Sequence, residues 1–120
     1  MTPGEIVDAQ VAAYNARDLA RFAATYSDAV TIFRMPSTEP AINGKAQLGE
    51  VYGRRFSAAS LHAEILNRIV IGNKVIDHER VHGIQDTPVE AVAVYEVVDG
   101  LIETVWFFYP DKPFPIPGKT

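Results

Sequence analysis

The sequence predicts an α+β protein in which three N-terminal helices pack in the concave face of a strongly curved, mainly antiparallel sheet. Helical periodicity is concentrated before residue 60, and long strand-like runs fill the rest of the chain. Gly72-Asn73 and Asp99-Gly100 are two-residue hairpin signals, so successive runs should form an antiparallel meander. Helices that precede such a sheet pack on one of its faces. A sheet that curls around them gives a cone with an apolar pocket.

Each expected helix has its own signal. Thr2 and Glu5 form a capping-box pattern around Pro3, which predicts a helix from the third residue onward. Asp18 is the N-cap of a second, short helix. An apolar stripe at helical spacing predicts the third helix, over about Lys45–Ala58.

The remaining segments are predicted to be strands. Ala29–Met35 is rich in β-branched and aromatic residues, and a turn-rich loop from Pro36 to Gly44 separates it from the third helix. Four long runs follow that helix, namely Leu61–Ile71, Lys74–Ile84, Val89–Val98 and Leu101–Tyr109.

Composition restricts the class of protein. A chain of 120 residues that is 48% hydrophobic forms one domain with a buried core. A formal charge of −4 argues against nucleic acid as a partner, because such binding depends on clustered Lys and Arg. No apolar run reaches the ~20 residues of a membrane span, and the N-terminus has no secretory signal pattern. We therefore expect a cytoplasmic protein with no membrane partner, and no cofactor motif is present.

Half of the eight prolines fall within residues 110–120. Their spacing predicts an extended C-terminal tail that lies over the surface or over a partner subunit.

The order helix, helix, strand, helix and four-strand meander resembles the nuclear transport factor 2-like superfamily, including its SnoaL-like and ketosteroid isomerase-like proteins. The similarity is carried by Arg17-Asp18-Leu19 at the second helix, by the segment Tyr26–Thr31, and by Ala41–Lys45 before the third helix. It extends to about Tyr109. The resemblance implies a cone-shaped fold, and homodimers formed through the sheet are common in this superfamily.

The resemblance does not extend to the catalytic residues of ketosteroid isomerase. The family's Asp base near the end of the first strand is replaced by Arg34 or Met35. The Tyr and Asp of its oxyanion hole correspond to about Gln10 and Ala93. Steroid isomerase chemistry is therefore not expected.

Limonene epoxide hydrolase is a second template within the resemblance. Its signature is an Arg and an Asp two residues apart on one strand, completed by an Asp on the last strand. Arg80 matches the Arg, His82 replaces the first Asp, and Phe108 stands at the second. An epoxide hydrolase-like enzyme with altered catalytic residues stays an alternative.

The second run of the meander carries polar residues on both faces. Alternation places His78, Arg80 and His82 on one face and Asp77 and Glu79 on the other. One interpretation directs the first three into the cone, with a histidine as proton carrier and Arg80 as oxyanion binder. The alternative is that this face forms cross-strand salt bridges or a dimer interface. A one-residue slip would exchange the two faces.

A metal site is not expected on this strand. His78 and His82 lie ~13 Å apart by strand rise, too far to share one ion. The only other histidine is His62.

Arg34 and two tyrosines are candidate ligand contacts. Arg34 has apolar neighbours on its face and could bind a carboxylate or enolate oxygen. Tyr14 and Tyr52 could direct their hydroxyls into the cavity or belong to the core. The alternative role of Arg34 is an ion pair with Glu64, Glu90 or Glu96.

The last strand supplies candidate pocket walls. Trp106 and Phe108 share a face that the resemblance places inside the cone, so they are candidate ligand-binding residues. Phe107 and Tyr109 would then lie on the outer face, where an aromatic patch usually marks an interface. We expect a homodimer through this outer face.

The sequence thus predicts a protein that binds a small, mostly apolar ligand carrying an oxygen function. With His82 or His78 as the base and an arginine on the oxyanion, it would catalyse proton transfer of the isomerase, cyclase or dehydratase type. The alternative from another class is a non-catalytic ligand-binding or dimerisation module.

Overall fold

The computed structural model describes residues 1–110, and residues 111–120, most of the predicted tail, lie outside the described part. Three helices occur in the described chain, α1 (Pro3–Asn15), α2 (Leu19–Ala24) and α3 (Lys45–Arg55). The strands are β1 (Tyr26–Arg34), β2 (Pro40–Asn43), β3 (His62–Ile71), β4 (Lys74–His82), β5 (Val89–Val98) and β6 (Leu101–Phe108). Among these residues no helix is both long enough and apolar enough to span a membrane.

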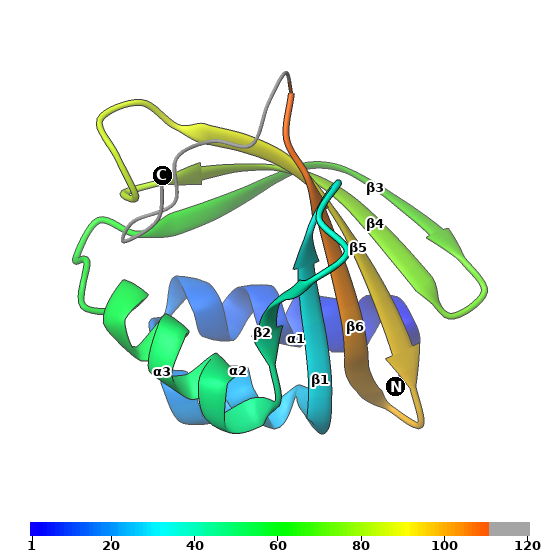
Figure 1. The fold of residues 1–120 in the computed structure, drawn as a ribbon. Helices are drawn as coiled ribbons and strands as arrows, with labels where there is room; N and C mark the ends of the chain where they lie inside the picture. Colours follow the sequence, from blue (N-terminus) through cyan, green and yellow to red (C-terminus); the bar gives the residue numbers. More distant parts are fainter. Residues whose placement is uncertain (111–120) are drawn as a thin grey trace.

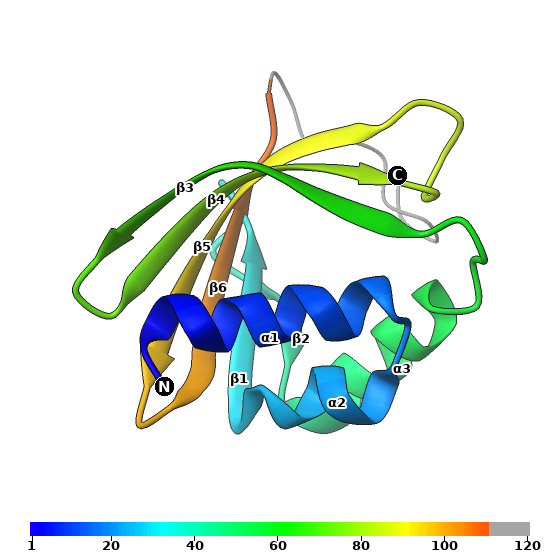
Figure 2. The ribbon, with the colours of Figure 1, turned by 180° about the vertical axis from the view of Figure 1, so that it is seen from behind.

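All six strands belong to one curved sheet whose order is β2-β1-β6-β5-β4-β3. Neighbouring strands are antiparallel except β1 and β6, which run parallel. The sheet bends around the helices, and α1 crosses its concave side (Figures 1 and 2). The predicted α+β cone is therefore confirmed.

The helix starts are confirmed. The Thr2 hydroxyl accepts a hydrogen bond from the Glu5 amide at 3.2 Å, and the Glu5 carboxylate accepts one from the Thr2 amide at 2.7 Å. The Asp18 carboxylate accepts from the Arg21 amide at 3.1 Å. The third helix ends at Arg55, three residues earlier than predicted.

One strand, β2, was not predicted. Pro40–Asn43 lies within the segment expected to be a loop, yet it pairs antiparallel with β1, and Ile42 opposes Ile32. Ile42 is only 1% exposed. Four residues are too few to show alternation in a sequence, so only the neighbouring strand reveals this one.

Aromatic side chains of the three helices and of β1 pack together in one cluster. Phe22 is fully buried, and its ring centroid lies 4.7 Å from that of Tyr52 and 5.0 Å from that of Tyr26. Tyr14 and Phe56 extend the cluster, with ring centroids 5.4 Å apart. This packing holds α2 and α3 against α1. Tyr14 and Tyr52 of the cluster also line a cavity.

Candidate functional site

The acidic face of β4 is the one that points to the interior. Asp77 and Glu79 are buried, as are Val75 and Val81 on either side of them, while the alternate residues are only partly buried. The two valines give the physical reason. They share a face with the acids, and burying them against the helices takes the acids inside as well.

The prediction that His78, Arg80 and His82 face the cone is wrong. These three side chains lie on the outer face and are each about two-fifths exposed. His78 Nε2 lies 2.5 Å from a Glu90 carboxylate oxygen. Arg80 Nη1 and His82 Nε2 lie 3.7 and 3.2 Å from the Glu64 carboxylate. The face therefore forms the cross-strand ion pairs that were the alternative interpretation, and exposed pairs of this kind stabilise a fold only slightly.

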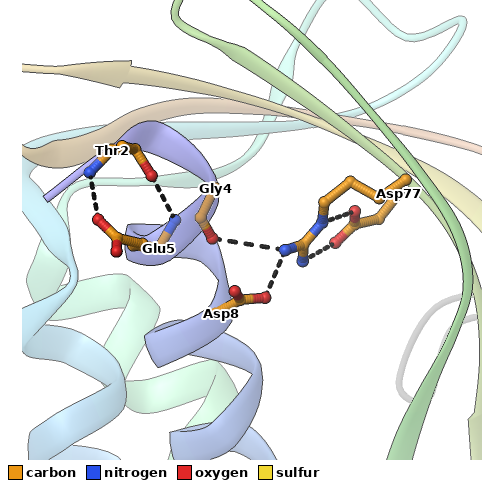
Figure 3. Close-up of polar contacts among 6 residues, drawn as sticks. Thr2, Gly4, Glu5, Asp8 and Asp77 are labelled. Atoms are coloured by element: carbon orange, nitrogen blue, oxygen red, sulfur yellow. Dashed lines mark hydrogen bonds and ion pairs between the residues drawn. The ribbon is translucent and has the colours of Figure 1, made fainter.

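Asp77 is fully buried and is held by an arginine of the neighbouring strand. Arg68 donates from Nε and Nη2 to the two carboxylate oxygens, at 2.6 and 2.9 Å. The same guanidinium contacts the Asp8 carboxylate and the Gly4 carbonyl in the first turns of α1 (Figure 3). Both oxygens of Asp77 are satisfied, so this acid fastens α1 to the sheet and is not available for chemistry.

Glu79, two residues further along, has no such partner. Its side chain is 7% exposed, and among residues 1–110 its carboxyl group forms no hydrogen bond or ion pair. Burial raises the pKa of Glu79 to about 8, with a further increase from Asp77 and an opposing effect of Arg55. A carboxyl group with a pKa near neutrality can both accept and donate a proton under physiological conditions.

Glu79 lies on the wall of a cavity of about 50 Å³ between the concave face of the sheet, α1 and α3. The paired neighbours of Glu79 are Ile65 on β3 and Ala91 on β5. The small side chain of Ala91 leaves space beside the carboxyl group. The volume suits a few waters or a compact small molecule. The polar lining also includes Gln10, Tyr14, Arg34, Tyr52, Arg55 and Tyr109.

Two arginines contribute positive charge to this cavity. Arg34 is the last residue of β1, and Arg55 is the last residue of α3. The Arg55 guanidinium lies 5.3 Å from the centroid of the Tyr52 ring, a cation–π arrangement that orients it. Within the described chain neither arginine forms an ion pair with a carboxylate.

Three buried polar atoms on lining residues have no hydrogen-bond partner in the described chain. They are Gln10 Oε1, Tyr14 Oη and Arg34 Nε. Burial raises the pKa of Tyr14, so its hydroxyl stays protonated and can donate. Buried polar atoms in folded proteins are nearly always paired. Unpaired atoms around a cavity therefore indicate a place for a ligand or water.

Three of the predicted ligand contacts, Arg34, Tyr14 and Tyr52, do line the cavity. Their binding role stays a prediction. The alternative ion pairs of Arg34 do not form, because the three glutamates pair with residues of β4. Glu64 pairs with Arg80, Glu90 with His78, and Glu96 with Lys74 at 3.4 Å.

The other two predicted contacts, Trp106 and Phe108, lie on the outer face. Phe107 and Tyr109, expected outside, line the cavity instead. The cause is a β-bulge in β6. Glu96 and Val97 are adjacent in β5, but their partners in β6 are Thr104 and Ile102, so Glu103 is an extra residue. An extra residue reverses the facing of every side chain beyond it, and a period-two count cannot detect it.

The sequence contained signals for residues that the prediction missed. Arg55 follows Tyr52 by three positions and Gln10 precedes Tyr14 by four, so each polar residue lies on the apolar stripe of its helix. Glu79 lies two residues from Val81, which indicates a shared buried face. No cluster of three His, Asp or Glu side chains placed to ligate a metal ion occurs within residues 1–110.

A family model for the SnoaL-like domain matches residues 7–105, which include the greater part of α1 and every later helix and strand up to β6. The chain belongs to the SnoaL-like domain family. No curated protein matches it.

Solved structures show the same fold for this SnoaL-like chain. A cystatin-fold protein from Novosphingobium aromaticivorans is 24% identical, with a TM-score of 0.80 and coverage of 89% of this chain and 97% of that one. A candidate polyketide cyclase from Sinorhizobium meliloti is 21% identical, with a TM-score of 0.74 and coverage of 86% and 93%. A candidate ketosteroid isomerase from Kribbella flavida is 22% identical, with a TM-score of 0.76 and coverage of 95% and 82%. At these identities the likeness shows the fold alone.

Proposed function

We propose that this SnoaL-like protein catalyses proton transfer on a small, oxygen-bearing substrate in the cavity, with Glu79 as general base and acid. The observation that carries the proposal is the buried Glu79 carboxyl group, which has no partner in the described chain and lies on the cavity wall. Burying a carboxyl group without a partner costs stability. A catalytic role explains why such a group is present. Glu79 thus takes the place of His82, His78 and Arg80 as the catalytic candidate.

The step fits the groups around the cavity. The ionised Glu79 carboxylate takes a proton from the carbon next to a carbonyl group. The C–H electron pair forms the enolate double bond, and the carbonyl π electrons move onto oxygen. Arg55 and the Tyr14 hydroxyl, both on the cavity wall, stabilise that oxyanion. In a substrate with a double bond next to the deprotonated carbon, the enolate extends over that double bond, and the Glu79 carboxylic acid returns the proton to its far (γ) carbon. The electron pair on oxygen re-forms the carbonyl group as the double bond shifts, which completes an isomerisation.

The raised pKa of Glu79 favours both the removal of the proton and its return. With a pKa of about 8, roughly one molecule in ten carries the carboxylate at pH 7. The base is stronger than an ordinary glutamate, and its conjugate acid still releases the proton readily. Solved structures with this fold include a candidate polyketide cyclase and a candidate ketosteroid isomerase, whose names fit enolate chemistry.

Solvent exchange tests the proposal directly. Small ketones, enones and 2-oxo acids are incubated in D2O with the wild-type protein, and deuterium incorporation next to the carbonyl is followed by NMR. We expect exchange with wild type and a loss of at least 100-fold in Glu79→Gln. His82→Gln, on the outer face, is the matched control and should keep the wild-type rate. Unchanged exchange in Glu79→Gln, or no exchange with any compound, contradicts the proposal. Binding without exchange favours the non-catalytic module.

We also propose that the outer face of the sheet forms a homodimer. Phe108 is 43% exposed there, beside its cross-strand neighbour Val92. Trp106 pairs with Val94 on the same face and is only partly buried. Aromatic and branched side chains gathered on an open sheet face are typical of an interface.

A further inference from the structure

Arg34 and Arg55 line the same cavity, although one comes from the sheet and the other from a helix. Burial raises the pKa of Tyr52 and that of Tyr109, and both arginines oppose the rise at each hydroxyl. Both arginines therefore bring positive charge to the part of the cavity that holds these two hydroxyl groups.

Their charge is not balanced by the described protein. On the outer face of the sheet Glu64, Glu90 and Glu96 pair with other side chains. Inside, Asp77 is held by Arg68. Among the described residues of the cavity wall Glu79 is the only acidic one, and it is mainly protonated at neutral pH. The protein as a whole has a formal charge of −4, so positive charge gathered in its interior is the reverse of its overall composition.

Uncompensated charge is costly away from water. Guanidinium groups that are partly removed from solvent need an anion or several hydrogen-bond acceptors nearby. The buried Nε of Arg34 has no hydrogen-bond partner in the described chain. Carboxylates match the planar donor array of a guanidinium, because their two oxygens can accept two parallel N–H bonds.

We propose that the cavity binds a small organic carboxylate, held at its carboxylate end by Arg34 and Arg55. In a 2-oxo acid the carbonyl oxygen is next to the carboxylate, so the five N–H donors of Arg55 serve both groups, as the oxyanion role proposed above requires. The carbon chain of the ligand lies against Ala63, Val89 and Ala91, which form part of the apolar wall. The volume of about 50 Å³ suits a chain of a few carbons. This inference rests on the proposed function, because the ligand is taken to be the substrate whose proton Glu79 transfers. It narrows the substrate class from ketones in general to carboxylates with a neighbouring carbonyl group or double bond.

Carboxylates and their neutral amides test the charge requirement at constant shape. Binding of pyruvate, pyruvamide, crotonate and crotonamide to the full-length protein is measured by calorimetry and by chemical-shift changes in two-dimensional NMR. We expect each carboxylate to bind at least tenfold more tightly than its amide. Arg34→Met and Arg55→Met should each remove that preference. Arg54→Met is the matched control, because Arg54 is the exposed neighbour on the same helix.

Three further variants keep the outcome interpretable. Arg34→Lys and Arg55→Lys retain the charge and should bind carboxylates measurably, even if a methionine variant folds poorly. Glu79→Gln separates the two proposals, because it should abolish exchange and still bind pyruvate. Equal affinity for carboxylate and amide in wild type overturns this inference, as does no binding of either carboxylate. Exchange that depends on Glu79 but shows no carboxylate preference leaves the proposed function intact. Carboxylate binding without exchange supports the carboxylate site and contradicts the proposed proton transfer.

Discussion

Replacing Glu79 with glutamine should change how the stability of the protein depends on pH. The Glu79 pKa is about 8 in the folded state, against an ordinary value of 4.5. Between these two values the folded chain binds more protons than the unfolded chain. The free energy of unfolding therefore falls as pH rises through this window. The rise in pKa corresponds to about 5 kcal/mol lost between pH 4 and pH 9, as an order of magnitude.

Glutamine has nearly the same shape and cannot ionise, so Glu79→Gln should lack this decline. Urea unfolding, followed by fluorescence of the single tryptophan at fixed protein concentration, gives the free energy of unfolding from pH 5 to pH 9. We expect the two proteins to be similar at pH 5, and the variant to be more stable by several kcal/mol at pH 9. Other titrating groups contribute equally to both proteins and cancel. Parallel pH profiles would show that Glu79 ionises normally, and the reasoning about its burial would be wrong.

Three further predictions concern other features. Asp77→Asn should lower the free energy of unfolding by about 3 kcal/mol, because it removes the charge that holds Arg68. Glu64→Gln, which breaks an exposed pair on the outer face, should lower it by under about 1 kcal/mol, and equal losses in urea unfolding would refute the difference between the buried and the exposed pair. Proton-transfer rates should rise with pH and level off above pH 8, since ionised Glu79 is the base; a flat rate profile contradicts this. Phe108→Glu should turn the proposed dimer into a monomer, as measured by light scattering, and a monomeric wild-type protein contradicts the proposed dimer.

Several features of the fold follow from local sequence. The capping box at Thr2 depends on residues three positions apart, so a short segment is enough to predict it. The Asp99-Gly100 hairpin depends on two residues that tolerate positive φ, and both adopt it, at 53° and 79°. These signals set the order and direction of the elements, which is enough for the α+β cone and for the family resemblance.

The candidate site was only partly predictable. Arg34, Tyr14 and Tyr52 were identified because each is a polar or amphipathic residue with apolar neighbours on its own element. Glu79 was assigned to the correct set of residues on β4, but that set was placed on the wrong side of the sheet. Arg55 was not identified, since an arginine near the end of a helix usually only complements the helix dipole.

Alternation along a strand shows which residues share a face, but it does not show which face is covered by helices. Only the packing of α1 and α3 decided that Asp77 and Glu79 lie inside and His78 outside. The extra residue in β6 exists only relative to the partner strand β5, so its reversal of Trp106 and Phe107 also depended on tertiary structure. The sequence alone determined the elements, their order and the resemblance. The assembled sheet decided which charges surround the cavity, because facing and register depend on contacts between segments that are distant in the chain.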